Sequence, residues 1–180
     1  METVASDRPA SREENFVSYL LTRIQQDKGL AARLRRADNP ATEYQSWEFL
    51  AGFGVDLEQE YQRLPFITVA AALAKARAER NGNFRLGQAI AACYTDDNQS
   101  DQAKAKLRRV LACDGLPELC RILRPVLTLI ESRVTQPLDY VRLLRQLQYF
   151  APHGQQIKAQ WAQEFYGRQT EADAPAEGAP

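Results

Sequence analysis

The sequence has little of the chemistry that metal sites and disulfide frameworks need. It holds three cysteines, Cys93, Cys113 and Cys120, with no CxxC spacing, and a single histidine, His153. A zinc site of the usual kind needs about four cysteine or histidine ligands at close spacings. The sequence therefore predicts no metal site, and we expect the thiols to be reduced and packed as small hydrophobic side chains.

Signals for membranes and for export are also missing. The longest apolar stretches are interrupted by arginine, and none approaches the roughly 18 residues of a membrane-spanning helix. Residues 1–15, METVASDRPASREEN, contain no apolar segment of the kind found in a secretory signal. We expect a cytoplasmic protein with no membrane partner.

No pattern of residues predicts an enzyme. The sequence contains no GxSxG, P-loop or HExxH motif. The acidic segment DLEQE at 56–60 does not place its carboxylates on one helical face, and His153 stands without a partner acid or base. We predict no catalytic residues and no cofactor, so a small helical enzyme lacks support.

The zero net charge hides an uneven distribution. Residues 75–168 hold 15 basic and 9 acidic side chains, whereas residues 15–74 hold 6 basic and 7 acidic ones, and both ends of the chain are acidic. This excess is smaller than that of a dedicated nucleic-acid-binding protein. It places the positive charge in the second half of the chain.

Apolar residues recur at helical spacing through the chain, and no strand-like alternation is present. The sequence predicts an all-α fold, a compact bundle of about eight helices with disordered termini. We expect a disordered tail over 1–13, a helical domain over 14–167 and a disordered acidic tail over 168–180. The helical domain forms either one unit or two packed halves, 14–95 and 96–167.

Prolines and caps predict where the helices begin and end. We expect helices to start at Pro40, Pro65, Pro117, Pro137 and Pro152, because proline suits the first helical position. Asn81-Gly82-Asn83 should end the helix that starts at Pro65, and a short helix, LGQAIAACY, follows it. Ser100 is the expected N-cap of the next helix, over 101–113. Pro125 should kink the helix that contains it.

Basic side chains mark the predicted outer faces of three of these helices. Lys106, Arg108 and Arg109 lie off the apolar stripe of helix 101–113. Arg121 and Arg124 are three residues apart and point away from the stripe of the next helix, and Arg142 and Arg145 repeat this spacing. Such faces favour a surface for nucleic acid or an acidic partner, and a solvated face without function is the alternative.

The order of segments resembles the small subunit of the type I-E CRISPR surveillance complex, the CasB family of Cascade. The resemblance covers residues 14–167. Its most specific parts are KLRRVLACDGLPELCRILRPVL at 106–127 and RLGQAIA at 85–91, and it also includes LAARLRRADNPA at 30–41 and PLDYVRLLRQLQYF at 137–150. None of these segments is a catalytic motif.

The resemblance implies a helical protein without enzymatic activity that acts in antiviral defence. It implies contacts with the backbone subunits that hold the guide RNA, with the large subunit and with a second copy of the chain. Its basic surface is expected to bind nucleic-acid backbone and stabilise the R-loop, including the target and displaced DNA strands. These are the partners that the family predicts.

The family's basic positions match this sequence at Arg35, Arg36, Lys106 and Arg124. The other predicted nucleic-acid-binding residues come from the helix faces or neighbouring positions of this chain: Arg85, Arg108, Arg109, Arg121, Arg142 and Arg145. Relatives carry a basic residue where this chain has Gln88, and basic residues where it has APHGQQ at 151–156. Arg85 and Lys158 are the candidates to replace those contacts.

Two binding alternatives remain open. The chain could be a helical adaptor whose basic face meets another protein subunit and not nucleic acid. A sequence-specific DNA binder would need a recognition helix with Asn or Gln reaching base edges. The arginine-bearing helices have few such residues, so the adaptor is the stronger alternative.

Overall fold

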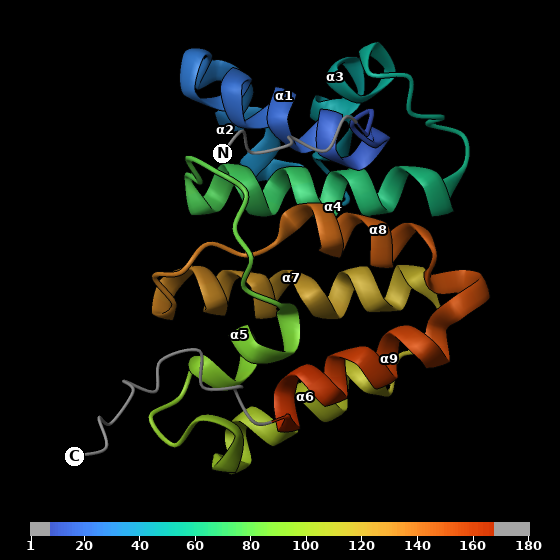
Figure 1. The fold of residues 1–180 in the computed structure, drawn as a ribbon. Helices are drawn as coiled ribbons and strands as arrows, with labels where there is room; N and C mark the ends of the chain where they lie inside the picture. The colour runs from blue at the N-terminus through green and yellow to red at the C-terminus, as the bar shows by residue number, and fades with distance from the viewer. Residues whose placement is uncertain (1–7, 168–180) are drawn as a thin grey trace.

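The structure, a computed structural model, describes residues 8–167, and helices dominate it (Figure 1). Within that range there are nine α-helices and two short 3-10 helices. In chain order they are α1 (Arg12–Gln26), α2 (Lys28–Arg36), η1 (Glu43–Ser46), α3 (Trp47–Gly52), α4 (Glu60–Ala76), α5 (Leu86–Ala92), η2 (Asp97–Gln99), α6 (Asp101–Leu111), α7 (Leu116–Arg133), α8 (Tyr140–Gln148) and α9 (Phe150–Tyr166). The all-α prediction is confirmed. None of the helices in residues 8–167 has both the length and the apolar character needed to cross a membrane.

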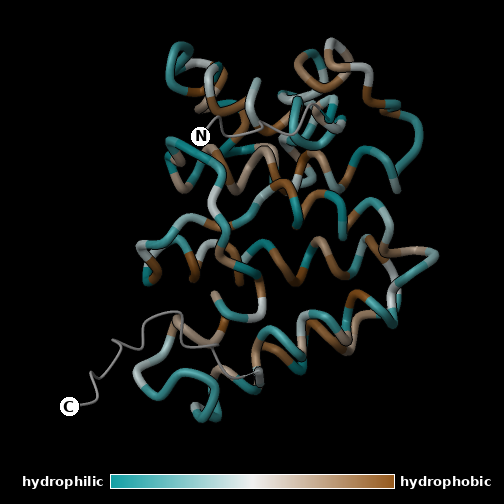
Figure 2. The backbone as a smooth tube through the Cα atoms, viewed as in Figure 1, coloured by the Kyte–Doolittle hydropathy of each residue, from teal (hydrophilic) through white to brown (hydrophobic). Residues whose placement is uncertain are grey.

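The helices stack in layers around α4 and α7. Figure 1 shows α1, α2 and α3 above α4, then α8 and α7, with α5, α6 and α9 below. Helix α4 is buried on nearly all sides because it packs against α2, α7 and α8. One hydrophobic core joins residues from both sides of residue 95, and the apolar positions follow the inner helix faces in Figure 2.

The structure corrects three of the predicted helix boundaries. No α-helix begins at Pro40, because Asn39 forms a turn by accepting a hydrogen bond from the Ala41 N–H. Helix α4 begins at Glu60, upstream of Pro65. The free energy gained by burying its apolar residues exceeds the cost of the backbone hydrogen bond that Pro65 cannot donate. It ends at Ala76 because Arg77 adopts a left-handed conformation (φ 49°, ψ 39°), before the Asn81 segment is reached.

The remaining boundaries are closer to the sequence prediction. Ser100 caps α6 by accepting from the Ala103 N–H at 3.3 Å. Helix α8 begins after Asp139, which accepts from the Arg142 N–H. Helix α7 runs through Pro125 without interruption. Helix α9 begins at Phe150, before the predicted start at Pro152, and is kinked at His153 (φ −126°, ψ 24°).

The described residues reach part of the predicted N-terminal tail and none of the predicted C-terminal tail. The predicted tail over 168–180 lies outside the described residues, as do residues 1–7 of the predicted N-terminal tail. Helix α1 already begins at Arg12, and Ser11 and Glu14 form its capping box. The Arg12 guanidinium also donates to the Gly54 carbonyl at 2.8 Å, so residues 11–13 belong to the helical body.

The segment over 81–84 fastens the start of α8. The Gly82 N–H donates to the Leu138 carbonyl at 2.8 Å, and the Asn81 Oδ1 accepts from the Tyr140 N–H at 2.8 Å and the Val141 N–H at 3.2 Å. A Cβ at Gly82 would lie 1.7 Å from the Pro137 carbonyl oxygen. Glycine is required here because the two backbones touch.

Gly87 in the RLGQAIA segment lies where α5 crosses α9 in close contact. A Cβ at Gly87 would lie 2.2 Å from the Trp161 carbonyl oxygen, so α5 and α9 would have to separate. We expect Gly87→Ala to lower the free energy of unfolding by about 1–3 kcal/mol, measured by urea denaturation. Gly52→Ala is the matched control, because its added Cβ would meet no heavy atom within 4 Å. Equal losses in the two variants would contradict the close crossing.

Candidate nucleic-acid interface

Helices α6 and α7 carry seven basic side chains outside the core. Five of them are here called the α6–α7 basic face: Lys106, Arg108, Arg109, Arg121 and Arg124. Arg108, Arg109 and Arg121 are exposed, and Lys106 and Arg124 are half-buried. The helical phase behind this arrangement is confirmed, because Leu107 and Leu123 are both fully buried. The core therefore fixes these basic side chains on the outer part of the two helices.

None of these five side chains has a carboxylate partner among the described residues. The ion pairs formed within 4.0 Å in residues 8–167 involve other arginines and lysines. The Nε of Arg124 is buried and has no hydrogen-bond acceptor, and Arg35 on α2 has the same property. A buried donor without an acceptor costs about 1–3 kcal/mol.

The turn between α6 and α7 gathers charges from three helices around Cys113. The pKa of this thiol is raised, mainly because the group is buried. The nearby positive charges of Lys158, Arg121 and Arg109 lower the pKa and so partly offset the effect of burial. Lys158 is itself engaged, because its side chain is only 12% exposed and its Nζ lies 3.9 Å from Asp114. Its ammonium also lies over the Phe150 ring, so Lys158 is poorly placed to replace a family contact.

The two arginines predicted to point outward on α8 have partners on neighbouring elements, while the side chains of Arg142 and Arg145 remain 34% and 44% exposed. The Arg142 guanidinium donates to the Glu164 Oε1 of α9 at 2.9 Å and 3.2 Å, and Glu164 is almost fully buried. Its other oxygen accepts from the Gly87 N–H at 3.2 Å. Arg145 donates to Ser11 Oγ at 3.3 Å. These arginines hold α8 against α1 and α9, a pairing that the spacing of α8 alone could not reveal.

The remaining predicted residues lie apart from the α6–α7 basic face. Arg35 is half-buried and Arg36 is exposed on α2, at the opposite end of the helix stack from α6 (Figure 1). Arg85 is exposed just before α5, where its N–H donates to the Gln88 side chain at 3.2 Å. The predicted residues therefore form no single cluster, and Gln88 serves as a helix cap.

Several exposed aromatic side chains were not singled out from the sequence. Tyr44, Trp47 and Tyr61 are 60%, 40% and 56% exposed. The Arg63 guanidinium lies over the Trp47 ring at 6.0 Å. Tyr44 lies in η1 and Trp47 begins α3, so these two exposed rings come from consecutive turns of the chain.

The cysteines and the acidic side chains of the described residues were the remaining candidates for chemistry. They contain no cluster of three histidine, cysteine or acidic side chains able to hold a metal. All three thiols are buried, as predicted, and burial raises the pKa of Cys120 to about 11. A thiol held protonated in this way is a poor nucleophile at neutral pH.

These features define a small helical protein whose helices α6 and α7 carry basic side chains that have no acidic partners within residues 8–167. The family model of the CRISPR-associated protein Cse2 matches residues 30–166, and the chain therefore belongs to the Cse2 family. The chain is also similar to the crystal structure of M. ruber CasB, with a TM-score of 0.70 and 28% sequence identity, over 87% of this chain and 93% of that chain. No curated protein matches the sequence. The family identifies a subunit of a CRISPR Cascade complex, and the resemblance to its small subunit is confirmed.

Proposed function

We propose that the chain is a non-catalytic small subunit of a type I-E Cascade complex that binds nucleic-acid backbone through the α6–α7 basic face. The observation that carries this proposal is the absence of a carboxylate partner for all five side chains within residues 8–167. R-loop formation exchanges one duplex for another of similar stability. Modest contacts to the target and displaced strands are therefore enough to stabilise the R-loop.

Backbone binding suits the face better than base readout. Arginine and lysine contacts to phosphate position a nucleic acid and carry no sequence information. The exposed aromatic side chains of the described chain lie on other elements, so the face offers no platform on which bases could stack. In this proposal the guide RNA reads the sequence and the chain holds the strands.

The proposal extends to the partners of the assembly. They are the backbone subunits with their guide RNA, the large subunit, the target DNA with its displaced strand, and a second copy of the chain, all in the cytoplasm. The alternative is a helical adaptor whose basic face meets another protein subunit and not nucleic acid. A salt titration separates the two functions.

We expect Arg121→Ala with Arg124→Ala to weaken single-stranded DNA binding equally for all sequences. Each phosphate contact on a single strand contributes roughly 0.7 to the slope of log affinity against log salt. The double variant should therefore lower that slope by about 1 to 1.5. The measurement is fluorescence anisotropy over a salt series, with circular dichroism to establish folding.

A matched control removes the same charge elsewhere. Arg77→Ala with Arg80→Ala changes two exposed arginines near the C-terminal end of α4 and should leave the slope unchanged. If the Arg121/Arg124 variant is folded and also keeps the wild-type slope, this face does not meet DNA. The adaptor function would then be the better account.

A further inference from the structure

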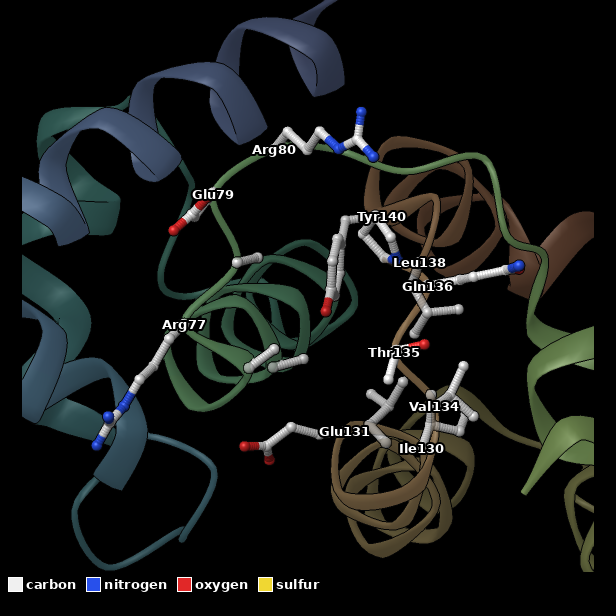
Figure 3. A pocket seen from close by; sticks show the side chains of 15 residues that line it. Arg77, Glu79, Arg80, Ile130, Glu131, Val134, Thr135, Gln136, Leu138 and Tyr140 are labelled. Carbon is white, nitrogen blue, oxygen red and sulfur yellow. The ribbon is translucent and has the colours of Figure 1, made fainter. Parts of the chain in front are cut away.

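A pocket lies at the C-terminal ends of α4 and α7, away from the α6–α7 basic face. Its volume is about 330 Å³, and the segment between α7 and α8 closes one side. The aliphatic part of its lining comes from three elements: Ala72, Ala76, Leu127, Ile130 and Val134. Figure 3 views the pocket between these helix ends.

Tyr140 supplies a polar group inside this pocket. The side chain is 5% exposed, and Figure 3 shows its hydroxyl directed between the ends of α4 and α7. The backbone N–H of Tyr140 bonds to Asn81, but its hydroxyl bonds to no described residue. Burial, with a smaller contribution from Glu131, raises the pKa of this phenol to about 12, so it stays protonated at neutral pH.

The four charged side chains that line the pocket point in different directions. Glu131 lines the pocket from α7, and its side chain extends sideways at the rim, whereas Arg77 and Arg80 direct their guanidinium groups away from the pocket (Figure 3). Glu79 also points away from the centre of the pocket. No lysine or arginine lies within 4.0 Å of the Glu131 carboxylate among the described residues. An occupant would meet aliphatic walls, a neutral phenol and one carboxylate.

We propose that this pocket receives a lysine or arginine side chain from a neighbouring protein subunit. The aliphatic stem of such a side chain packs against the alanine, leucine, isoleucine and valine walls. Its charged end pairs with Glu131 and donates a hydrogen bond to the Tyr140 hydroxyl oxygen. The proposal rests on the chain being a subunit of an assembly, and it is independent of nucleic-acid binding by the α6–α7 basic face.

The chemistry is tested first with small probes on the full chain. n-Butylguanidinium and n-butylammonium carry the stem and the charge, and n-butanol carries a similar stem without charge. We expect saturable amide shifts around Tyr140 in ¹H–¹⁵N spectra for both cations, with roughly millimolar affinity, and weaker binding of butanol. Equal binding of butanol would overturn the proposal, because charge would then play no part.

Single substitutions then show which carboxylate binds the cation. Glu131→Gln should weaken binding of butylguanidinium about threefold to fivefold, and Tyr140→Phe should weaken it by a similar factor. Glu79→Gln is the matched control, because it removes the same charge from the same rim at a side chain directed away. Equal effects of the two glutamate variants would overturn the assignment.

The assembly provides the final test. Retention of the Glu131→Gln/Tyr140→Phe chain in the purified complex with guide RNA should be lost at lower salt than retention of the Glu79→Gln chain. Single-stranded DNA binding by the isolated double variant should match wild type. Unchanged retention would overturn docking by a partner, whereas altered DNA binding with unchanged retention would place the pocket on the nucleic-acid surface and also overturn it.

Discussion

Replacing Arg142 by alanine should lower the free energy of unfolding by about 3 to 5 kcal/mol, a large loss for a basic side chain expected on a binding surface. The reason is the burial of its partner, because the Glu164 side chain is only 4% exposed. Without Arg142 that carboxylate keeps the Gly87 N–H but loses the guanidinium that neutralises it. Urea denaturation measures the loss.

The same variant tests the role of Arg142 in binding. Under mild conditions where it remains folded, its slope of log DNA affinity against log salt should equal that of wild type. Arg33→Ala is the matched control for stability, because Arg33 lies 3.9 Å from the 90% exposed Glu48 and should cost less than about 1 kcal/mol. A small stability loss together with a reduced slope would show that Arg142 contacts nucleic acid and that its pair with Glu164 is dispensable.

The second large effect concerns the core beneath the α6–α7 basic face. Leu107→Ala and Leu123→Ala should each cost about 2–5 kcal/mol, because both side chains are fully buried and truncation leaves a cavity. Thermal and urea unfolding of each variant measure this cost. Leu111→Ala is a useful comparison, because Leu111 is only partly buried on the same helix and should cost less. Harmless truncation of both Leu107 and Leu123 would mean that the helical phase of α6 and α7 is wrong, and with it the position of the basic side chains.

The sequence was sufficient for the basic face on α6 and α7 because the apolar stripe of a helix determines which residues lie opposite it. The same reasoning did not reveal the partners of Arg142 and Arg145, which lie beside the apolar stripe of α8 and bond to residues of other elements. Whether the flank of a helix faces water depends on how its neighbours cross it. Here Glu164 and Ser11 come from α9 and from the start of α1, far away in the sequence.

Helix boundaries were also predicted correctly where they depend on local contacts and incorrectly where they depend on distant ones. Ser100 was predicted correctly because an N-cap is a local hydrogen bond to the next turn. Pro65 was misjudged because the residues before it gain more from packing than proline costs within a long buried helix. The role of Asn81 was predicted only as a helix break. Its actual partners are the Tyr140 and Val141 amides, and no local pattern points to them.

The hydrogen bonds from the first turn of α8 to the Asn81 side chain also affect the order in which the helices fold. A helix start that depends on a side chain from a distant part of the chain cannot be completed until the long intervening loop closes. That loop contains α5, α6 and α7. When it closes, these three helices are brought close to α4 and α8. Helix α8 should therefore be among the last elements to become stable, and the two halves of the chain should fold as one cooperative unit.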